Sequence, residues 1–163
     1  MEQTKQATRR LTVTLLTDAA ILTLACLIPA ASHLLAVPLY KLNPMLALLL
    51  AGIVVGKDWH NGLLLAVLLP TVSCLVSGMP AMPKMLCMVA EFAAVAAAFG
   101  WLERRWAVLP AVLTAVLAGK VVFYLLKAAL LPAEALIDIE WWIQAATVVL
   151  WGGLFALLYR QRS

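Results

Sequence analysis

Three ionisable residues lie deep within apolar stretches of the sequence: Asp18, Glu91 and Lys120. A charged side chain at the centre of a membrane helix costs on the order of 2.5–3.5 kcal/mol, so each needs a partner or a polar cavity. Glu91 is expected roughly 12 Å below the outer start of its helix, and Lys120 at a similar depth. The two can therefore pair, either as a structural link between helices or as a polar patch that meets a ligand.

Further polar and aromatic side chains fall toward the same membrane face. They predict a pocket in which Glu91 and Lys120 fix a polar or charged substrate and aromatic rings stack on it. Trp141 and Trp142 also fit the aromatic belt of a membrane interface, the more common role for such a pair. The residues predicted to bind substrate are His33, Tyr40, Asn43, Met79, Lys84, Glu91, Lys120, Tyr124, Trp141, Trp142 and Gln144.

The elements that must position these residues are membrane helices. The chain has 163 residues, of which 65% are hydrophobic and 12% charged, and its mean hydropathy is +1.00. A soluble domain cannot bury so much apolar surface, and the alternation of a membrane barrel is absent. Residues 1–163 are therefore expected to form one all-α membrane domain, a bundle of six transmembrane helices over about 11–31, 44–56, 60–77, 83–102, 106–131 and 139–159.

The loop charges predict the orientation, because basic residues resist translocation. With the N-terminus in the cytoplasm, eight basic residues lie inside and three outside, which favours an even number of crossings and two cytoplasmic termini. The inner residues are Lys5, Arg9, Arg10, Lys57, Arg104, Arg105, Arg160 and Arg162; the outer ones are Lys41, Lys84 and Lys127.

The second expected helix is too short to span the bilayer alone. A helix over residues 44–56 rises about 20 Å, less than the roughly 30 Å of hydrocarbon. The deficit disappears if residues 32–43 dip into the bundle from outside, where protein or a wet cavity can satisfy irregular backbone. The segment from His33 to Asn43 is then part of a lid over a cavity; the alternative is an ordinary loop beside a thinned bilayer.

Motifs of enzyme chemistry are missing from the sequence. It contains no Walker loop, G-x-S-x-G, H-E-x-x-H or paired-carboxylate motif, so we expect no enzyme, cofactor or metal site. The cysteines Cys26, Cys74 and Cys87 are scattered among apolar residues and are expected to pack. Active transport would require another subunit to supply ATP hydrolysis.

A series of motifs runs through residues 28–100: IPAASHLL, NPMLALLLAGIVVG, LLPTVSCLVSGMPAMPKM and VAEFAAVAAAFG. In order and spacing it resembles the substrate-binding S component of energy-coupling factor (ECF) transporters, small six-helix proteins that capture vitamins and related micronutrients. The positions that carry the resemblance are Pro29, His33, Pro44, Met45, Gly52, Gly56, Pro70, Ser73, Gly78, Met79, Pro80, Pro83, Glu91 and Gly100.

The resemblance implies a multi-pass protein of the bacterial cell membrane that binds substrate under its outer loops. It also implies a complex with a transmembrane T component and two ATP-binding cassette ATPases. S components often carry A-x-x-x-A on the first helix as the docking surface for the T component, whereas this chain has Ala19 and Thr23 beside Asp18. Asp18 is expected to be structural or to face a partner, and the three residues form the predicted docking site.

A second interpretation belongs to another class of protein. A scaffold subunit of a cell-envelope complex would have the same helices and need no cavity. A small membrane enzyme is disfavoured, because no set of nucleophile, base and metal ligands converges.

Overall fold

The computed structural model describes residues 2–36, 42–130 and 141–162. Over these ranges the chain is helical and contains no strand. Five of the helices are long and apolar enough to span a membrane, so the architecture is that of a multi-pass membrane protein. The helices are α1 (Glu2–Leu34), α2 (Pro44–Gly56), α3 (Trp59–Ser77), α4 (Met82–Leu102), α5 (Val108–Leu130) and α7 (Trp141–Arg162).

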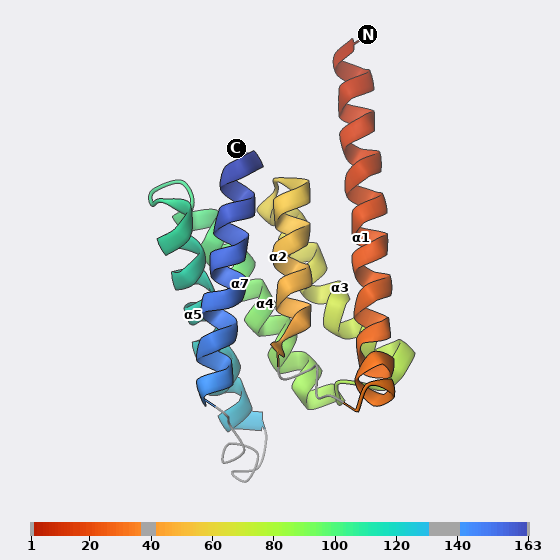
Figure 1. Ribbon diagram of the computed structural model, residues 1–163, viewed down its shortest axis with the longest axis vertical. Coiled ribbons are helices and arrows are strands. Elements are labelled where there is room, and N and C mark those ends of the chain that lie inside the picture. Colours follow the sequence, from red (N-terminus) through yellow and green to blue (C-terminus); the bar gives the residue numbers. More distant parts are fainter. Residues whose placement is uncertain (1, 37–41, 131–140, 163) are drawn as a thin grey trace.

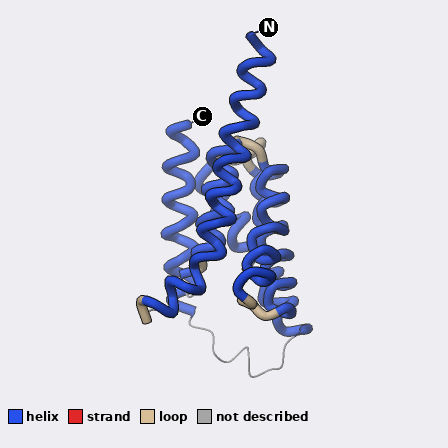
Figure 2. The backbone as a smooth tube through the Cα atoms, turned by 90° about the vertical axis from the view of Figure 1, so that its right-hand side faces the viewer, coloured by secondary structure: helices blue, strands red, loops and turns tan. Residues whose placement is uncertain are grey.

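Five helices form a closed ring, and α1 packs on its outside. Around the ring α2 contacts α3, α3 contacts α4, α4 contacts α5, α5 contacts α7, and α7 returns to α2. Helix α1 packs against α2 and α3, on the opposite side of the bundle from α5 (Figure 1). Both described chain ends lie at the same end of the bundle, as an even number of crossings requires (Figures 1 and 2).

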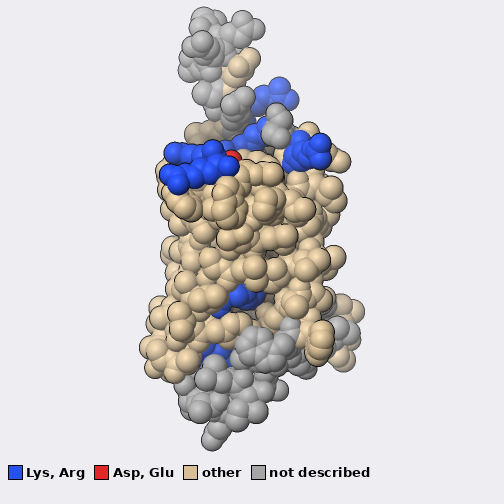
Figure 3. All heavy atoms as spheres, turned by 90° about the vertical axis from the view of Figure 1, so that its left-hand side faces the viewer, with Lys and Arg blue, Asp and Glu red and all other residues tan. Residues whose placement is uncertain are grey.

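We call the end at which α4 begins the outer end, and the opposite end the inner end. Most of the Lys and Arg side chains in this view gather at the inner end, above a belt without surface charge, and smaller patches of Lys or Arg lie further toward the outer end (Figure 3). Lys57, Arg104 and Arg105 belong to the exposed turns at that end. This distribution is the one that the loop charges predict; which end faces the cytoplasm stays a prediction.

The core of the ring is apolar and densely packed. The most extensive helix contact joins α4 and α5, where Gly119 lets the two backbones approach. At the inner end, Phe99 meets Phe155 and Tyr159 edge to face, and the Tyr159 hydroxyl donates a hydrogen bond of 2.7 Å to Glu103. Fully buried apolar side chains fill the interior: Leu46, Leu49, Ile53, Leu65, Leu69, Phe92, Val95, Phe99, Val112 and Val116.

The bounds of α2 follow from its flanking residues. Pro44 occupies the first turn, where its missing N–H costs nothing. Asn43 precedes it in the left-handed conformation, with φ 48°, and Lys57 ends the helix with φ 50°. The sequence predicts 44–56, and the structure has the same thirteen residues.

The other predicted spans agree with the structure to within a few residues, except at the N-terminus. Helix α1 begins at Glu2 rather than near residue 11, and it projects beyond the rest of the bundle (Figures 1 and 2). The reason is that hydropathy locates the membrane span, here Leu11–Leu34, but not the helix. The residues before it include Glu, Lys, Gln and Ala, which are good helix formers.

Candidate ligand site

Glu91 of α4 and Lys120 of α5 form an ion pair inside the bundle. The Lys120 Nζ lies 2.8 Å from Glu91 Oε1, and the two side chains are 11% and 2% exposed. The pairing that the sequence permitted is therefore present. Its two charges neutralise each other in an apolar interior, where either one alone would be very costly.

The close approach of the two helices brings the pair together. A Cβ atom added to Gly119 would lie 2.9 Å from the backbone oxygen of Glu91 and would also collide with Val95. Only glycine leaves this space free, so Lys120 can reach across from the next position. The Lys120 ammonium also lies 5.6 Å from the centre of the Phe123 ring, a favourable cation–π distance.

Asn43 joins the pair from the loop before α2. An asparagine at this position normally caps the helix, but the side chain of Asn43 makes no capping hydrogen bond. It instead lies close enough to the Glu91 carboxylate to interact with it. A left-handed backbone together with a missing cap is a local cost that the interaction with Glu91 offsets.

The short length of α2 explains how a loop residue reaches a buried pair. Helix α4 has 21 residues and α2 has 13, so α2 spans roughly 12 Å less. Glu91 lies nine residues into α4, or about 13 Å below its outer start. The residue before α2 is therefore at the depth of Glu91, and the Trp151 indole N–H holds this segment with a 2.7 Å hydrogen bond to the Leu42 carbonyl oxygen.

Tyr124 and the lysines of α4 and α5 lie on the outer side of the pair. Tyr124 is half-buried and lies about one helical turn beyond Lys120 on the same face of α5. Lys84 is exposed near the start of α4, and Lys127 is half-buried near the end of α5. The structure thus brings Asn43, Glu91, Lys120 and Tyr124 together, with a basic border toward the outer end.

Other predicted residues lie further from this centre or outside the described ranges. His33 is exposed in the last turn of α1, a helix that packs on α2 and α3. Trp142 is 89% exposed, the orientation expected of an aromatic belt, and the backbone oxygen of Gln144 accepts a hydrogen bond from Thr147. Tyr40 and the Trp141 side chain lie outside what the structure describes.

Met79 lies in a turn that is fixed by serine hydroxyls. The buried Ser73 hydroxyl donates a 2.9 Å hydrogen bond to the Met79 carbonyl oxygen, and the Met79 N–H donates to the Ser77 hydroxyl at 3.3 Å. Gly78 supplies the left-handed residue that ends α3, with φ 70°. The Met79 side chain is half exposed at the outer end, beside the start of α4.

The residues predicted to dock a partner separate into two groups. Asp18 is 8% exposed, and its Oδ1 accepts a 3.1 Å hydrogen bond from the Asn61 amide of α3. Ala19 and Thr23 are exposed, and the Thr23 hydroxyl donates to the Ala19 carbonyl oxygen at 2.8 Å. Asp18 thus connects α1 to the ring, whereas Ala19 and Thr23 are exposed on α1 and could contact a partner.

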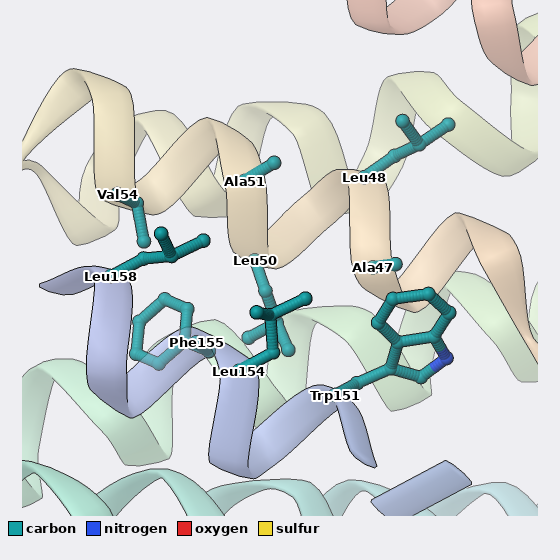
Figure 4. A pocket seen from close by; sticks show the side chains of 9 residues that line it. All are labelled: Ala47, Leu48, Leu50, Ala51, Val54, Trp151, Leu154, Phe155 and Leu158. Carbon is teal, nitrogen blue, oxygen red and sulfur yellow. The ribbon is translucent and has the colours of Figure 1, made fainter.

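A pocket of about 260 Å³ lies elsewhere, between α2 and α7. Its walls are hydrocarbon apart from the indole nitrogen of Trp151, and it includes neither Glu91 nor Lys120 (Figure 4). Apolar side chains from both helices line it: Ala47, Leu48, Leu50, Ala51, Val54, Trp151, Leu154, Phe155 and Leu158. An apolar lining of this kind has almost no groups that could form hydrogen bonds with a polar ligand.

The sequence analysis missed two residues that contribute to these contacts. Asn61 is the partner of Asp18, and Lys127 lies on the border of the ligand site. Lys127 follows Lys120 by seven residues, a spacing that returns to the same helix face and could have indicated it. Among the described residues, no three His, Cys, Asp or Glu side chains gather as metal ligands do.

The chain was compared with family models, with curated proteins and with solved structures, and no match was found in any of the three comparisons.

Proposed function

We propose that the protein is the substrate-binding S component of an ECF-type importer. It captures a vitamin or a related micronutrient at the outer face of the membrane. A T component and two ATP-binding cassette ATPases then drive delivery across the membrane. Support comes from the motif series over residues 28–100 and from the polar centre inside an otherwise apolar ring.

The observation that carries the proposal is the convergence of Asn43, Glu91 and Lys120. A structural ion pair between α4 and α5 needs no residue from a distant loop. Here the loop residue adopts a left-handed conformation and leaves its helix uncapped, yet interacts with Glu91. Local costs of this kind cluster at binding sites, where preorganised polar groups determine the orientation of a ligand.

In this proposal each residue has a distinct role. Glu91 accepts a hydrogen bond from the ligand and Lys120 donates one, and the Tyr124 ring packs against its apolar part. Asn43 ends the segment from His33 that the sequence predicts as a lid, of which residues 37–41 lie outside the described residues. In the proposal, Asn43 links ligand binding to this first loop. The exposed face of α1 that carries Ala19 and Thr23 contacts the T component, while Asp18 keeps α1 attached to α3.

The test is purification with the native ligand. The protein is isolated in a mild detergent, denatured, and the extract analysed by mass spectrometry. We expect a stoichiometric small molecule, and ATPase subunits that co-purify when the protein is isolated from its source membrane. The variant in which Glu91→Gln and Lys120→Gln are combined should lose the molecule, whereas Asp18→Asn at the inner end should retain it.

A contrary result is also well defined. An empty extract together with a lack of co-purifying ATPases would contradict the proposal and favour a scaffold subunit of a cell-envelope complex. A scaffold would also tolerate the double Gln variant without loss of its partner.

A further inference from the structure

The apolar pocket between α2 and α7 opens on the outer surface of the ring. Its floor is formed by Leu50, Val54 and Phe155, which are at most 5% exposed. Its rim includes Ala51 and Leu154, both of which are exposed. Because α7 is long and apolar enough to span a membrane and α2 is apolar along its whole length, a pocket on this surface faces lipid rather than water.

The pocket extends along both helices. It follows α2 from Ala47 to Val54 and α7 from Trp151 to Leu158. Each stretch advances by seven residues, or about 10 Å along the helix axis. The acyl chains of a bilayer run in the same general direction, because membrane helices and lipid chains both lie roughly along the membrane normal. The shape of the pocket therefore suits one extended hydrocarbon chain.

Trp151 closes the pocket toward the outer end. Its indole N–H donates a hydrogen bond of 2.7 Å to the Leu42 carbonyl oxygen, which fixes the ring beside Ala47 (Figure 4). Val54 and Leu158 mark the opposite end of the pocket, which leads toward the inner end of the bundle. A chain that enters the pocket is therefore expected to come from the leaflet at the inner end.

The inner end to which the pocket leads is rich in basic side chains (Figure 3). Lys57 directly follows α2, Arg160 comes two residues after Leu158, and Arg104 and Arg105 lie in the turn after α4. A border of this kind attracts anionic phospholipid headgroups. The attraction adds up over all the charges, and it acts whether or not a given side chain also has contacts within the protein.

We infer that the pocket between α2 and α7 binds an acyl chain of an anionic phospholipid whose headgroup lies at the inner end. A hydrocarbon-lined pocket does not hold water, and its walls lose van der Waals contacts when nothing fills it. The inference goes beyond the proposed function and does not depend on it, because the pocket includes neither Glu91 nor Lys120.

The experiment measures lipid retention by the full chain. The protein is purified in a mild detergent, washed free of lipid, mixed with dioleoyl phosphatidylglycerol and analysed by native mass spectrometry. We expect the wild type to retain phosphatidylglycerol in preference to dioleoyl phosphatidylcholine at the same concentration. Lysophosphatidylglycerol, which has a single acyl chain, should compete with it, whereas glycerophosphoglycerol, the headgroup without acyl chains, should not.

Variants of small pocket residues locate the bound lipid. Ala51→Phe and Ala47→Leu both add side-chain atoms to the lining of the pocket, and each should abolish the retention of phosphatidylglycerol. Ala97→Phe is the matched control, because Ala97 is an exposed alanine of α4 that lies as far from the inner end of its helix as Ala51 does in α2. It should retain the lipid as the wild type does. Melting temperatures without lipid show that each variant folds, and either pocket variant suffices for the test.

Several results would overturn the inference. It fails if the wild type retains no phospholipid or retains phosphatidylcholine equally well. It also fails if glycerophosphoglycerol competes, because headgroup charge alone would then explain the binding. Equal retention by Ala51→Phe and Ala97→Phe would place the lipid elsewhere on the protein. A dimer mass without bound lipid would identify a second copy of the chain as the occupant of the pocket.

Discussion

Glu91 and Asp18, the two buried carboxylates in the described part of the chain, have very different partners. Glu91 is 2% exposed and meets the full charge of Lys120 at 2.8 Å, and the Asn43 side chain lies close enough to interact with it. Asp18 is 8% exposed and accepts one hydrogen bond of 3.1 Å from the neutral Asn61 amide. The first arrangement is balanced in charge, whereas the hydrogen bond from Asn61 leaves the charge of Asp18 uncompensated.

This difference distinguishes the proposed ligand site from a structural contact. The outer assembly draws on α4, α5 and the loop before α2, three elements that meet only because α2 is short. The inner contact joins two helices, α1 and α3, that already pack together. Under the proposed function, a molecule that enters from the outer end meets groups that can exchange partners, whereas Asp18 and Asn61 attach α1 to α3.

The largest effect is expected from Lys120→Met. It leaves Glu91 buried without its cation, which should lower the free energy of unfolding by about 3–5 kcal/mol. Combining Glu91→Leu with Lys120→Met removes both charges and should restore stability to within about 1 kcal/mol of the wild type. Unfolding in a mixed detergent–SDS titration measures all the variants.

The double variant also distinguishes stability from binding. It should be folded but unable to retain the small molecule that, under the proposed function, we expect to purify with the wild type. If Lys120→Met and the double variant were equally unstable, the cost would come from lost packing, and the contrast between the two carboxylates would be wrong.

Gly119→Ala tests the helix contact beneath the pair. The new methyl group would meet the Glu91 backbone oxygen at 2.9 Å and the Val95 side chain, so the helices must separate. We expect a loss of about 1–3 kcal/mol in the free energy of unfolding, typical of overpacking. Gly153→Ala in α7 is the matched control, because its Cβ would enter open space; equal losses in both variants would refute the contact.

Asp18→Asn should have a smaller effect on stability, and it should leave the free energy of unfolding unchanged or increase it. The substitution removes a charge that faces an amide rather than a cation, and the new side-chain oxygen can still accept from Asn61. The free energy of unfolding should stay within about 1 kcal/mol of the wild type or increase. A loss comparable to that of Lys120→Met would show that Asp18 has a cationic partner.

Much of the fold follows from local sequence signals. Pro44 and Gly56 mark the ends of α2 to the residue, because proline starts a helix readily and the chain turns after the glycine. Similar depth indicates that Glu91 and Lys120 can pair, and the structure shows the pair. Turn residues and hydropathy thus determine where each helix lies and which charges can meet.

The rest depends on tertiary contacts that no local pattern encodes. Asn61 is 43 positions from Asp18, and nothing in its neighbourhood indicates that pairing. The side chain of Asn43 could equally have capped α2, as its position before a helix suggests, and only the fold brings Glu91 within its reach. The pocket between α2 and α7 likewise depends on how tightly these two helices pack, which the composition of the chain does not specify.

The smallest effect is expected at a third carboxylate, Asp58, which is exposed where Glu91 and Asp18 are buried. It caps α3: its Oδ1 accepts from the His60 N–H at 2.9 Å and lies 2.8 Å from His60 Nδ1. Partial burial alone would raise the pKa of Asp58, but its hydrogen bonds and attraction to His60 lower the pKa below its ordinary value. A lowered pKa means that this contribution to stability is complete above the unfolded value of about 3.9 and is lost as the pH falls through the folded value.

Because the Asp58 side chain is 51% exposed, solvent screens its charge, and the contribution should be below about 1 kcal/mol. Asp58→Asn keeps a capping oxygen but cannot titrate, so melting curves of the two proteins between pH 6 and pH 3 isolate the effect. The wild type should lose slightly more of its melting temperature than the variant over this range. Parallel curves would show that the charge of the solvent-exposed Asp58 adds nothing to stability. Of the two ion pairs, Asp58–His60 and Glu91–Lys120, only the buried one would then stabilise the fold.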